Sequence, residues 1–359
     1  MGSSPQPPDR APGERRVTSG LRVVAIGGGT GLSTLLKGLR HYAIPPGERR
    51  ARADGPYIHD LCAVVTVSDD GGSSGRLRKE LNMLPPGDIR NCIVALSEDE
   101  PLLSKLFQHR FDKGSGLEGH SFGNLFLAAL TAITKDFSEA VRLSSEILAT
   151  RGHIHPATTS HVELEALMDD GTRVRGETKI TASKGRINEL FLVPADVEPQ
   201  PQTLQAIASA DLITMGPGSL FTSLIPNLLV RGIPQAIAAS SAIKVYVCNL
   251  MTQANESLGR TAADHIRALN RHAGGQVFDY AIMNRKQMSS ELKAKYALEG
   301  ATQVVVDSEA IQELGVKPML GDYLEEGEVA RHATDRVARD VLNLVWEKQS
   351  SRRSLARVT

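Results

Sequence analysis

The sequence predicts an α/β fold of the Rossmann type, a mainly parallel sheet with helices on both faces. Apolar runs such as 23–26 and 61–67 show no polar alternation, which is typical of strands that are buried on both faces. Glycine-rich turns follow several of these runs, and apolar residues at helical spacing follow the turns. The 359 residues, 41% of them apolar, allow one large domain with an ample core, which we place at 21–345.

Composition narrows the class of protein. The 41 basic and 41 acidic residues give no net charge, so we expect no nucleic-acid partner and no binding to anionic membranes. Three cysteines, Cys62, Cys92 and Cys248, lie far apart in apolar surroundings and are predicted to be reduced core thiols. No apolar run approaches the about 18 residues that span a bilayer, and no signal peptide opens the sequence. We therefore expect a cytoplasmic protein.

The first strand leads into the first candidate binding loop. Residues 1–20, rich in Pro, Ser, Gly and Arg, are predicted to be a disordered tail. The strand 23–26 is followed by a glycine turn and by a helix that begins near Leu32. Unpaired N–H groups at such a helix start attract phosphate, although a glycine turn can also be purely steric. The turn is neither a dinucleotide fingerprint nor a Walker loop. The candidate ligand residues are Gly28, Gly29, Thr30 and Gly31.

A second glycine loop follows the strand 61–67. Because ligands gather at the carboxyl ends of parallel strands, this loop should lie beside the first. Its adjacent carboxylates suit Mg²⁺, or the hydroxyls of a ribose or sugar; the alternative is an Asx-type turn that caps the next helix. The candidate residues are Asp69, Asp70, Ser73 and Ser74.

The segment 85–91 starts the next helix. Asp88 is a plausible N-cap there. Arg90 and Asn91 fall in the first helical turn, where the macrodipole disfavours an arginine, so an anionic partner would explain Arg90. A further helix is predicted at 101–111, with its inward side formed by Leu102, Leu103, Leu106 and Phe107.

A long helix is predicted from Phe122 to Val141, with an apolar stripe that belongs to the core. His120, Ser121 and Asn124 lie at its N-terminus, where anion binding and simple capping are both open.

The pattern then alternates, which predicts a small antiparallel β excursion at about 157–195. Its strands are expected at 161–168 and 173–181, with a possible third at 187–193. His153 and His155 form an H-x-H pair near His161, but no further ligand stands at a convincing spacing, so a metal site is not favoured.

The strand 211–215 repeats the strand, glycine turn and helix order of the first loop. N–H groups around Gly218 would form a second anion cradle, and two cradles suggest a ligand with a diphosphate or a terminal phosphate. The next strand, 243–247, also ends in polar residues, and 280–284 and 303–307 are predicted to close the sheet before a basic C-terminal tail at 346–359. The candidate residues are Gly216, Gly218, Ser219, Thr222, Asn249 and Thr252.

These motifs, in this order, resemble the gluconeogenesis-factor (YvcK, GlmR) branch of the CofD superfamily from about Arg22 to about His332. The resemblance implies a Rossmann-like cytoplasmic protein that binds UDP-N-acetylglucosamine or a related UDP-sugar, with contacts from Tyr296 and Arg331. It also implies a role in cell-wall precursor supply and cell shape during gluconeogenic growth, in some members through the glutamine–fructose-6-phosphate amidotransferase. We also expect a homo-oligomer. The motifs are 26–33, 67–78, 85–91, 119–124, 215–223 and 249–253.

The same superfamily implies one alternative, a nucleotide-dependent transferase of the 2-phospho-lactate type that uses Mg²⁺. Its substrate aspartate aligns with Asp88, but the loop 69–74 differs from that of the transferase branch. No Ser–His–Asp order, pair of general acids or nucleophilic lysine stands out. A regulatory UDP-sugar binder without a firm cofactor is therefore favoured.

Overall fold

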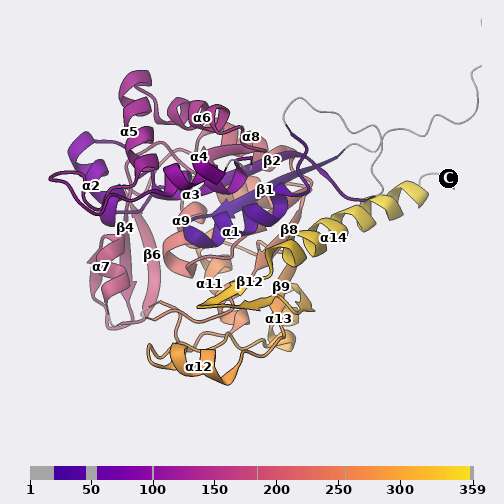
Figure 1. Cartoon of the computed structure of the whole chain (residues 1–359). Coiled ribbons are helices and arrows are strands. Elements are labelled where there is room, and N and C mark those ends of the chain that lie inside the picture. The colour runs from indigo at the N-terminus through magenta and orange to yellow at the C-terminus, as the bar shows by residue number, and fades with distance from the viewer. Residues whose placement is uncertain (1–19, 46–54, 99–100, 184, 255, 356–359) are drawn as a thin grey trace, which may run out of the picture.

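A parallel sheet of seven strands forms the centre of the protein (Figure 1). The structure, a computed structural model, describes residues 20–45, 55–98, 101–183, 185–254 and 256–355. Nearly all of the predicted N-terminal tail lies outside these residues. The strands are β1 (Leu21–Gly27), β2 (Ile58–Val65), β3 (His153–Pro156), β7 (Leu212–Met215), β8 (Ile243–Val247), β9 (Tyr280–Asn284) and β10 (Lys317–Gly321), in the sheet order β10-β9-β8-β7-β1-β2-β3.

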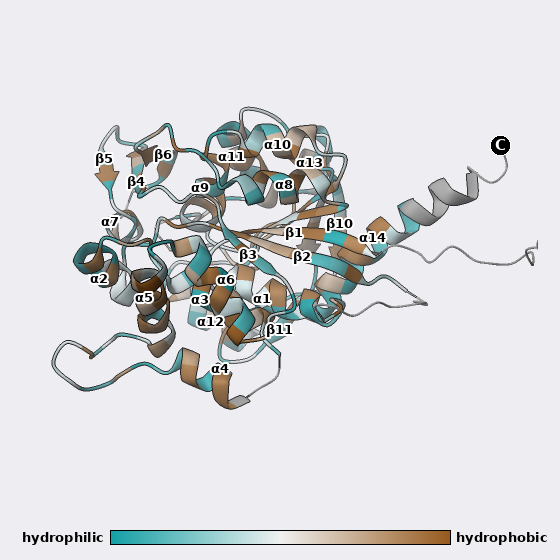
Figure 2. Ribbon diagram, turned by 90° about the horizontal axis from the view of Figure 1, so that it is seen from above, coloured by the Kyte–Doolittle hydropathy of each residue, from teal (hydrophilic) through white to brown (hydrophobic). Residues whose placement is uncertain are grey.

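Helices cover both faces of the sheet, as Figure 2 shows, which confirms the predicted Rossmann-like α/β class. One face carries α1 (Gly29–Arg40), α3 (Gly87–Leu96) and α6 (Phe137–Ile147), and the other carries α8 (Pro201–Ser209), α10 (Ile233–Ala239), α11 (Ala262–Ala273) and α13 (Ser308–Glu313). The other helices are α2 (Gly72–Leu81), α4 (Pro101–Gln108), α5 (Phe122–Thr134), α7 (Glu177–Ala182), the π-helix η1 (Leu220–Leu224), α9 (Ile225–Leu228), α12 (Ser290–Ala297) and α14 (Thr334–Leu355).

The middle of the sheet forms the core because both of its faces are covered. The apolar runs 23–26 and 61–65 are buried, as the lack of polar alternation predicts. Cys62, Cys92 and Cys248 are buried free thiols, also as predicted. None of the helices in the described part of the chain has the length and apolar character needed to cross a bilayer.

The strand order changes direction between β1 and β7. From β1 the chain adds β2 and β3 on one side, and then returns to add β7, β8, β9 and β10 on the other. Such a switch point leaves a crevice outside the carboxyl ends of the two central strands, because their connections leave in opposite directions.

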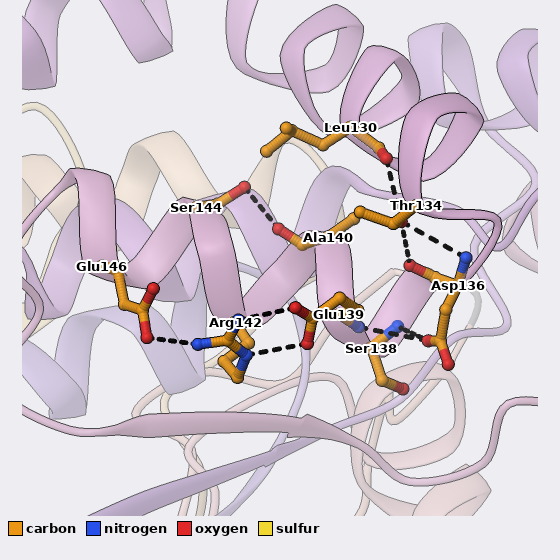
Figure 3. Close-up of polar contacts among 9 residues, drawn as sticks. All are labelled: Leu130, Thr134, Asp136, Ser138, Glu139, Ala140, Arg142, Ser144 and Glu146. Atoms are coloured by element: carbon orange, nitrogen blue, oxygen red, sulfur yellow. Dashed lines mark hydrogen bonds and ion pairs between the residues drawn. The ribbon is translucent and has the colours of Figure 1, made fainter.

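The helix predicted from Phe122 to Val141 is two helices, α5 and α6. The chain turns at Lys135, which has φ +60°, and at Asp136. Asp136 Oδ1 accepts hydrogen bonds from the N–H groups of Ser138 (2.7 Å) and Glu139 (3.1 Å), so it caps a new helix (Figure 3). The predicted single helix is wrong because this cap starts α6 inside the periodic stretch.

The predicted antiparallel excursion is present as the sheet β5-β4-β6. The strands are β4 (Glu163–Met168), β5 (Arg173–Arg175) and β6 (Ile187–Val193). The prediction of a strand through Thr181 is wrong, because β5 ends at Arg175 and α7 follows. Asp70, from the loop after β2, accepts a hydrogen bond from the N–H of Thr178 (2.9 Å) and stabilises the start of α7.

Two further segments differ from the prediction. Residues 303–307 form no strand; the sheet is closed by β10. In α4, Phe107 is buried, whereas Leu102 is 80% and Leu106 is 42% exposed, because only one side of this short helix packs on α5, through Phe107. The segment 346–359 continues α14 as far as Leu355. A small hairpin, β11 (Leu324–Glu326) and β12 (Ala330–His332), precedes α14.

Candidate functional site

A cavity of about 770 Å³ lies along the carboxyl ends of β2, β1, β7 and β8, which are consecutive in the sheet. The loop after each of these strands contributes to its wall, and α7, α12 and β12 close its sides. It therefore spans the switch point between β1 and β7. Its lining is Gly28, Gly29, Thr30, Gly31, Thr34, Asp69, Asp88, Glu177, Pro217, Gly218, Ser219, Thr222, Ser223, Asn249, Leu250, Met251, Thr252, Gln253, Ala254, Tyr296, Glu299, Ala301, Val329, Ala330, Arg331 and His332.

The turn after β1 requires a glycine at position 31 because it packs directly against the turn after β7. A Cβ atom on Gly31 would lie 2.2 Å from the carbonyl oxygen of Pro217, which no real contact allows. Gly29, the first residue of α1, lines the cavity and has φ +62°, a conformation that favours glycine. The N–H groups of Thr30 and Gly31 lie in the first turn of α1, where no intrahelical partner exists, so they are available to an anion.

The turn after β7 is held against the loop after β8. The side-chain amide of Asn249 accepts from the N–H of Gly218 (3.1 Å) and donates to its carbonyl (2.7 Å). Gln253 donates to the hydroxyl of Ser219 (2.9 Å). These bonds fix the two loops as one wall of the cavity.

The predicted second anion cradle differs from expectation. The helix start after β7 belongs to η1, and the N–H groups of Phe221 and Thr222 donate to Glu256 Oε1 at 2.6 and 3.0 Å. Glu256 is buried, which raises the pKa of its carboxyl group. An internal carboxylate therefore occupies the N–H groups that follow Gly218 and Ser219, the two residues whose N–H groups the sequence pattern offered to a phosphate. Of those two, Gly218 donates its N–H to Asn249.

The acidic side chains at the β2 end belong to different elements. Asp88 does not cap α3, whose N-cap is Pro86; its Oδ2 accepts from the N–H of Gly29 (2.7 Å) instead. Burial, and then repulsion from Asp69, raise the pKa of Asp88 to about 6. Burial and the neighbouring acids Asp69 and Asp88 raise the pKa of Glu177, from α7, to about 9.

The loop after β2 supplies one cavity residue and one structural residue. Asp69 lines the cavity and accepts from the N–H of Gly71 (2.9 Å). Asp70 faces away and binds Thr178, as in the capping alternative, although the helix that it caps is α7. Across the described residues, no three His, Cys, Asp or Glu side chains are grouped to hold a metal ion.

A separate polar network lies at the start of α5, outside the cavity wall. The hydroxyl of Ser73 contacts His120 Nδ1 (2.9 Å) and accepts from the amide of Asn124 (3.0 Å). Arg90 donates to Ser121, which caps α5, and to Asn91 (2.7 Å). Burial, and then the charge of Arg76, lower the pKa of His120. Ser121 therefore follows the capping alternative, and Arg90 has neutral partners.

The opposite end of the cavity carries Tyr296 and Arg331. The hydroxyl of Tyr296 accepts from the N–H of Ala330 (3.0 Å), and His332 Nε2 contacts the carbonyl of Cys248 (3.0 Å), so the hairpin is tied to both α12 and β8. The exposed guanidinium of Arg331 has no hydrogen bond or ion pair with any described residue. It is the sole Lys or Arg side chain among the described residues of the lining.

The structure brings together thirteen of the candidate ligand residues around this cavity and leaves nine outside its lining. Those that line it are Gly28, Gly29, Thr30, Gly31, Asp69, Asp88, Gly218, Ser219, Thr222, Asn249, Thr252, Tyr296 and Arg331. Those that do not are Asp70, Ser73, Ser74, Arg90, Asn91, His120, Ser121, Asn124 and Gly216. Sequence reasoning missed Glu177 and Glu299, which no glycine loop or strand end marks, and it passed over Gln253 beside Thr252.

Comparison with known proteins finds relatives over most of the chain. A model of the 2-phospho-L-lactate transferase CofD family matches residues 23–324. The gluconeogenesis factor of Halalkalibacterium halodurans is 48% identical over 322 residues, which cover 89% of this chain and 95% of that protein. That of Bacillus subtilis is 46% identical over 327 residues, 91% of this chain and 98% of that protein. A crystal structure of a UPF0052-family protein from Bacillus halodurans superimposes with a TM-score of 0.84 at 46% identity, covering 90% of this chain and all of that one.

Proposed function

Because the chain belongs to the CofD family and matches its gluconeogenesis factors over nearly their whole length, we propose that its cavity binds a UDP-sugar, UDP-N-acetylglucosamine first of all. In this proposal the protein is a cytoplasmic regulator of cell-wall precursor supply and cell shape during gluconeogenic growth. The observation that carries the proposal is the Arg331 guanidinium, which has no partner among the residues that the structure describes and lines a cavity on the switch point of the sheet.

The size and the lining of the cavity support a nucleotide-sugar. Its volume of about 770 Å³ falls within the range of about 300–1,000 Å³ that is usual for small-molecule sites. Arg331 can form a bidentate, charge-assisted contact with a diphosphate, and the N–H groups at the start of α1 lie in the same cavity. Tyr296 offers an aromatic face for a base.

One observation favours the alternative, a nucleotide-dependent transferase. Asp88 lines the cavity with a pKa of about 6, which suits a general base near neutral pH. The relatives that the chain matches over nearly their whole length are, however, gluconeogenesis factors. We therefore give preference to the binding protein.

Titration calorimetry with UDP-N-acetylglucosamine and ATP tests the proposal. We expect the UDP-sugar to bind and to raise the melting temperature of the protein, while ATP does neither. At 100 times its dissociation constant, a ligand adds about 2.7 kcal/mol to the free energy of unfolding. ATP binding without UDP-sugar binding would contradict the nucleotide assignment. Prolonged incubation with Mg²⁺ should leave the UDP-sugar intact; release of UDP or UMP that is lost in Asp88→Asn would favour the transferase.

The proposed partners need separate experiments. The regulator is proposed to act on the glutamine–fructose-6-phosphate amidotransferase, so adding the protein to that enzyme should change its rate, and the UDP-sugar should modulate the change. The proposed homo-oligomer predicts a mass in light scattering that is a multiple of the 38.7 kDa chain.

A further inference from the structure

The two ends of the cavity differ in chemistry because of the strand order. The loops after β2, β1, β7 and β8 form its wall in that sequence, so the loop after β2 and the loop after β8 are three strand spacings apart. With a spacing of 4.7–4.9 Å this separation is about 14 Å. A ligand that fills the cavity therefore meets different side chains at each end.

The β2 end is acidic. Asp69 follows β2. Asp88 lies near Asp69, beside the loop after β1, where its Oδ2 accepts from the N–H of Gly29 (2.7 Å). Glu177 joins them from α7, with its Oε2 3.5 Å from the hydroxyl of Ser68. The carboxylates of Asp69 and Asp88 accept hydrogen bonds from hydroxyl groups and repel phosphate and carboxylate groups, so a diphosphate is disfavoured here. Glu177, whose pKa burial raises to about 9, adds a polar carboxyl group that keeps its proton near neutral pH.

The β8 end carries an apolar and aromatic cluster, with the acid Glu299 nearby in the lining. Leu250 and Met251, which follow β8, form a small hydrophobic cluster against which Tyr296 and Ala330 pack. Arg331, the next residue after Ala330, supplies the positive charge beside this cluster. A flat base that stacks on an aromatic ring, with phosphates near an arginine, matches these groups.

We infer that the cavity fixes the direction of its ligand, with the sugar at the acidic end formed by Asp69, Asp88 and Glu177 and the uracil at the Tyr296 end. The diphosphate then lies between the two glycine turns and Arg331. This inference rests on the proposed UDP-sugar function and deepens it. The site selects neutral, hydroxyl-rich sugars and rejects sugars that carry a carboxylate.

The test compares UDP-glucose with UDP-glucuronic acid, which differ by a hydroxymethyl and a carboxylate group on the sugar. We expect the unmodified protein to bind the uronic acid about tenfold or more weakly, because like charges are brought together at the acidic end. Asp69→Asn keeps the acceptor that binds the N–H of Gly71 and removes a charge, so it should lower this ratio several-fold.

Glu299→Gln is the matched comparison, because Glu299 lines the cavity just after α12, at the other end. If the ligand has the inferred direction, Glu299→Gln leaves the ratio of the affinities for UDP-glucose and UDP-glucuronic acid as it is in the unmodified protein. A ratio lowered by Glu299→Gln and unchanged by Asp69→Asn would mean that the ligand lies the other way round, which overturns the inference.

The comparison of UDP-glucose with UDP-glucuronic acid in the unmodified protein does not depend on whether any variant folds. Equal affinity for the two sugars refutes the inference but leaves the proposed function intact, because both UDP-sugars still bind. If neither UDP-sugar nor UDP binds, the proposed function fails, and the inference fails with it.

Discussion

Arg331→Ala should weaken UDP-N-acetylglucosamine binding without destabilising the free protein. The Arg331 guanidinium contacts no described polar partner, so its removal leaves no buried group unsatisfied. What is lost is the charge-assisted contact with the diphosphate, about 1.5–3 kcal/mol for a hydrogen bond to a charged group, or about 10- to 150-fold in affinity. Because Arg331 is exposed, solvent screening places the expected value in the lower half of that range.

Calorimetric titration at low and at high salt, together with a melting curve of the ligand-free protein, measures this effect. Arg331→Lys keeps the charge but not the bidentate fork, so it should recover part of the affinity. Arg339→Ala, on α14 and outside the cavity lining, is the control. Unchanged affinity in Arg331→Ala, or a lowered melting temperature of the ligand-free variant, would refute the reasoning.

Three further predictions concern stability and are read from urea unfolding. Asp136→Ala should cost about 1 kcal/mol by removing the cap of α6, while Asp136→Asn should retain most of it. Gly31→Ala should cost about 1–3 kcal/mol, because its Cβ would collide with the turn after β7, whereas Gly275→Ala meets nothing within 4 Å. Burial raises the pKa of Glu177 from 4.5 to about 9, so the folded protein keeps a proton that the unfolded chain releases, and stability falls as pH rises through that window. Glu177→Gln should therefore be more stable than wild type at about pH 8. Glu313→Gln, at an exposed position, should not be. If the free energy of unfolding changed with pH equally in wild type and Glu177→Gln, this prediction would be contradicted.

The strands and their glycine turns were predictable because they depend on local pattern. A buried parallel strand needs a continuous apolar run, and Gly31 must be glycine where two turns touch, so both leave a mark in the sequence. That the loops after these strands lie side by side was predictable from the parallel topology alone, because the carboxyl ends of parallel strands meet at one edge of the sheet. This is why Asp69, Gly218 and Asn249 could be placed near one cavity before their contacts were known.

What sequence reasoning missed depends on contacts between distant segments. The start of α7 is bound by Asp70, 108 residues earlier than Thr178, so an alternating stretch became helical. The N–H groups of η1 are occupied by Glu256, some 35 residues later, so a pattern typical of anion binding became an internal contact. Neither partner is marked by the residues next to the segment that it binds.

The contact between Asp70 and α7 joins two parts of the cavity wall, one from the central sheet and one from the element beside the small sheet β5-β4-β6. Glu177 reaches the acidic end only while the small sheet β5-β4-β6 is docked on the loop after β2. A transient opening of that sheet removes part of the cavity wall, so a bound ligand disfavours the opening by mass action. We therefore expect hydrogen exchange in β4, β5 and β6 to become slower when a ligand occupies the cavity.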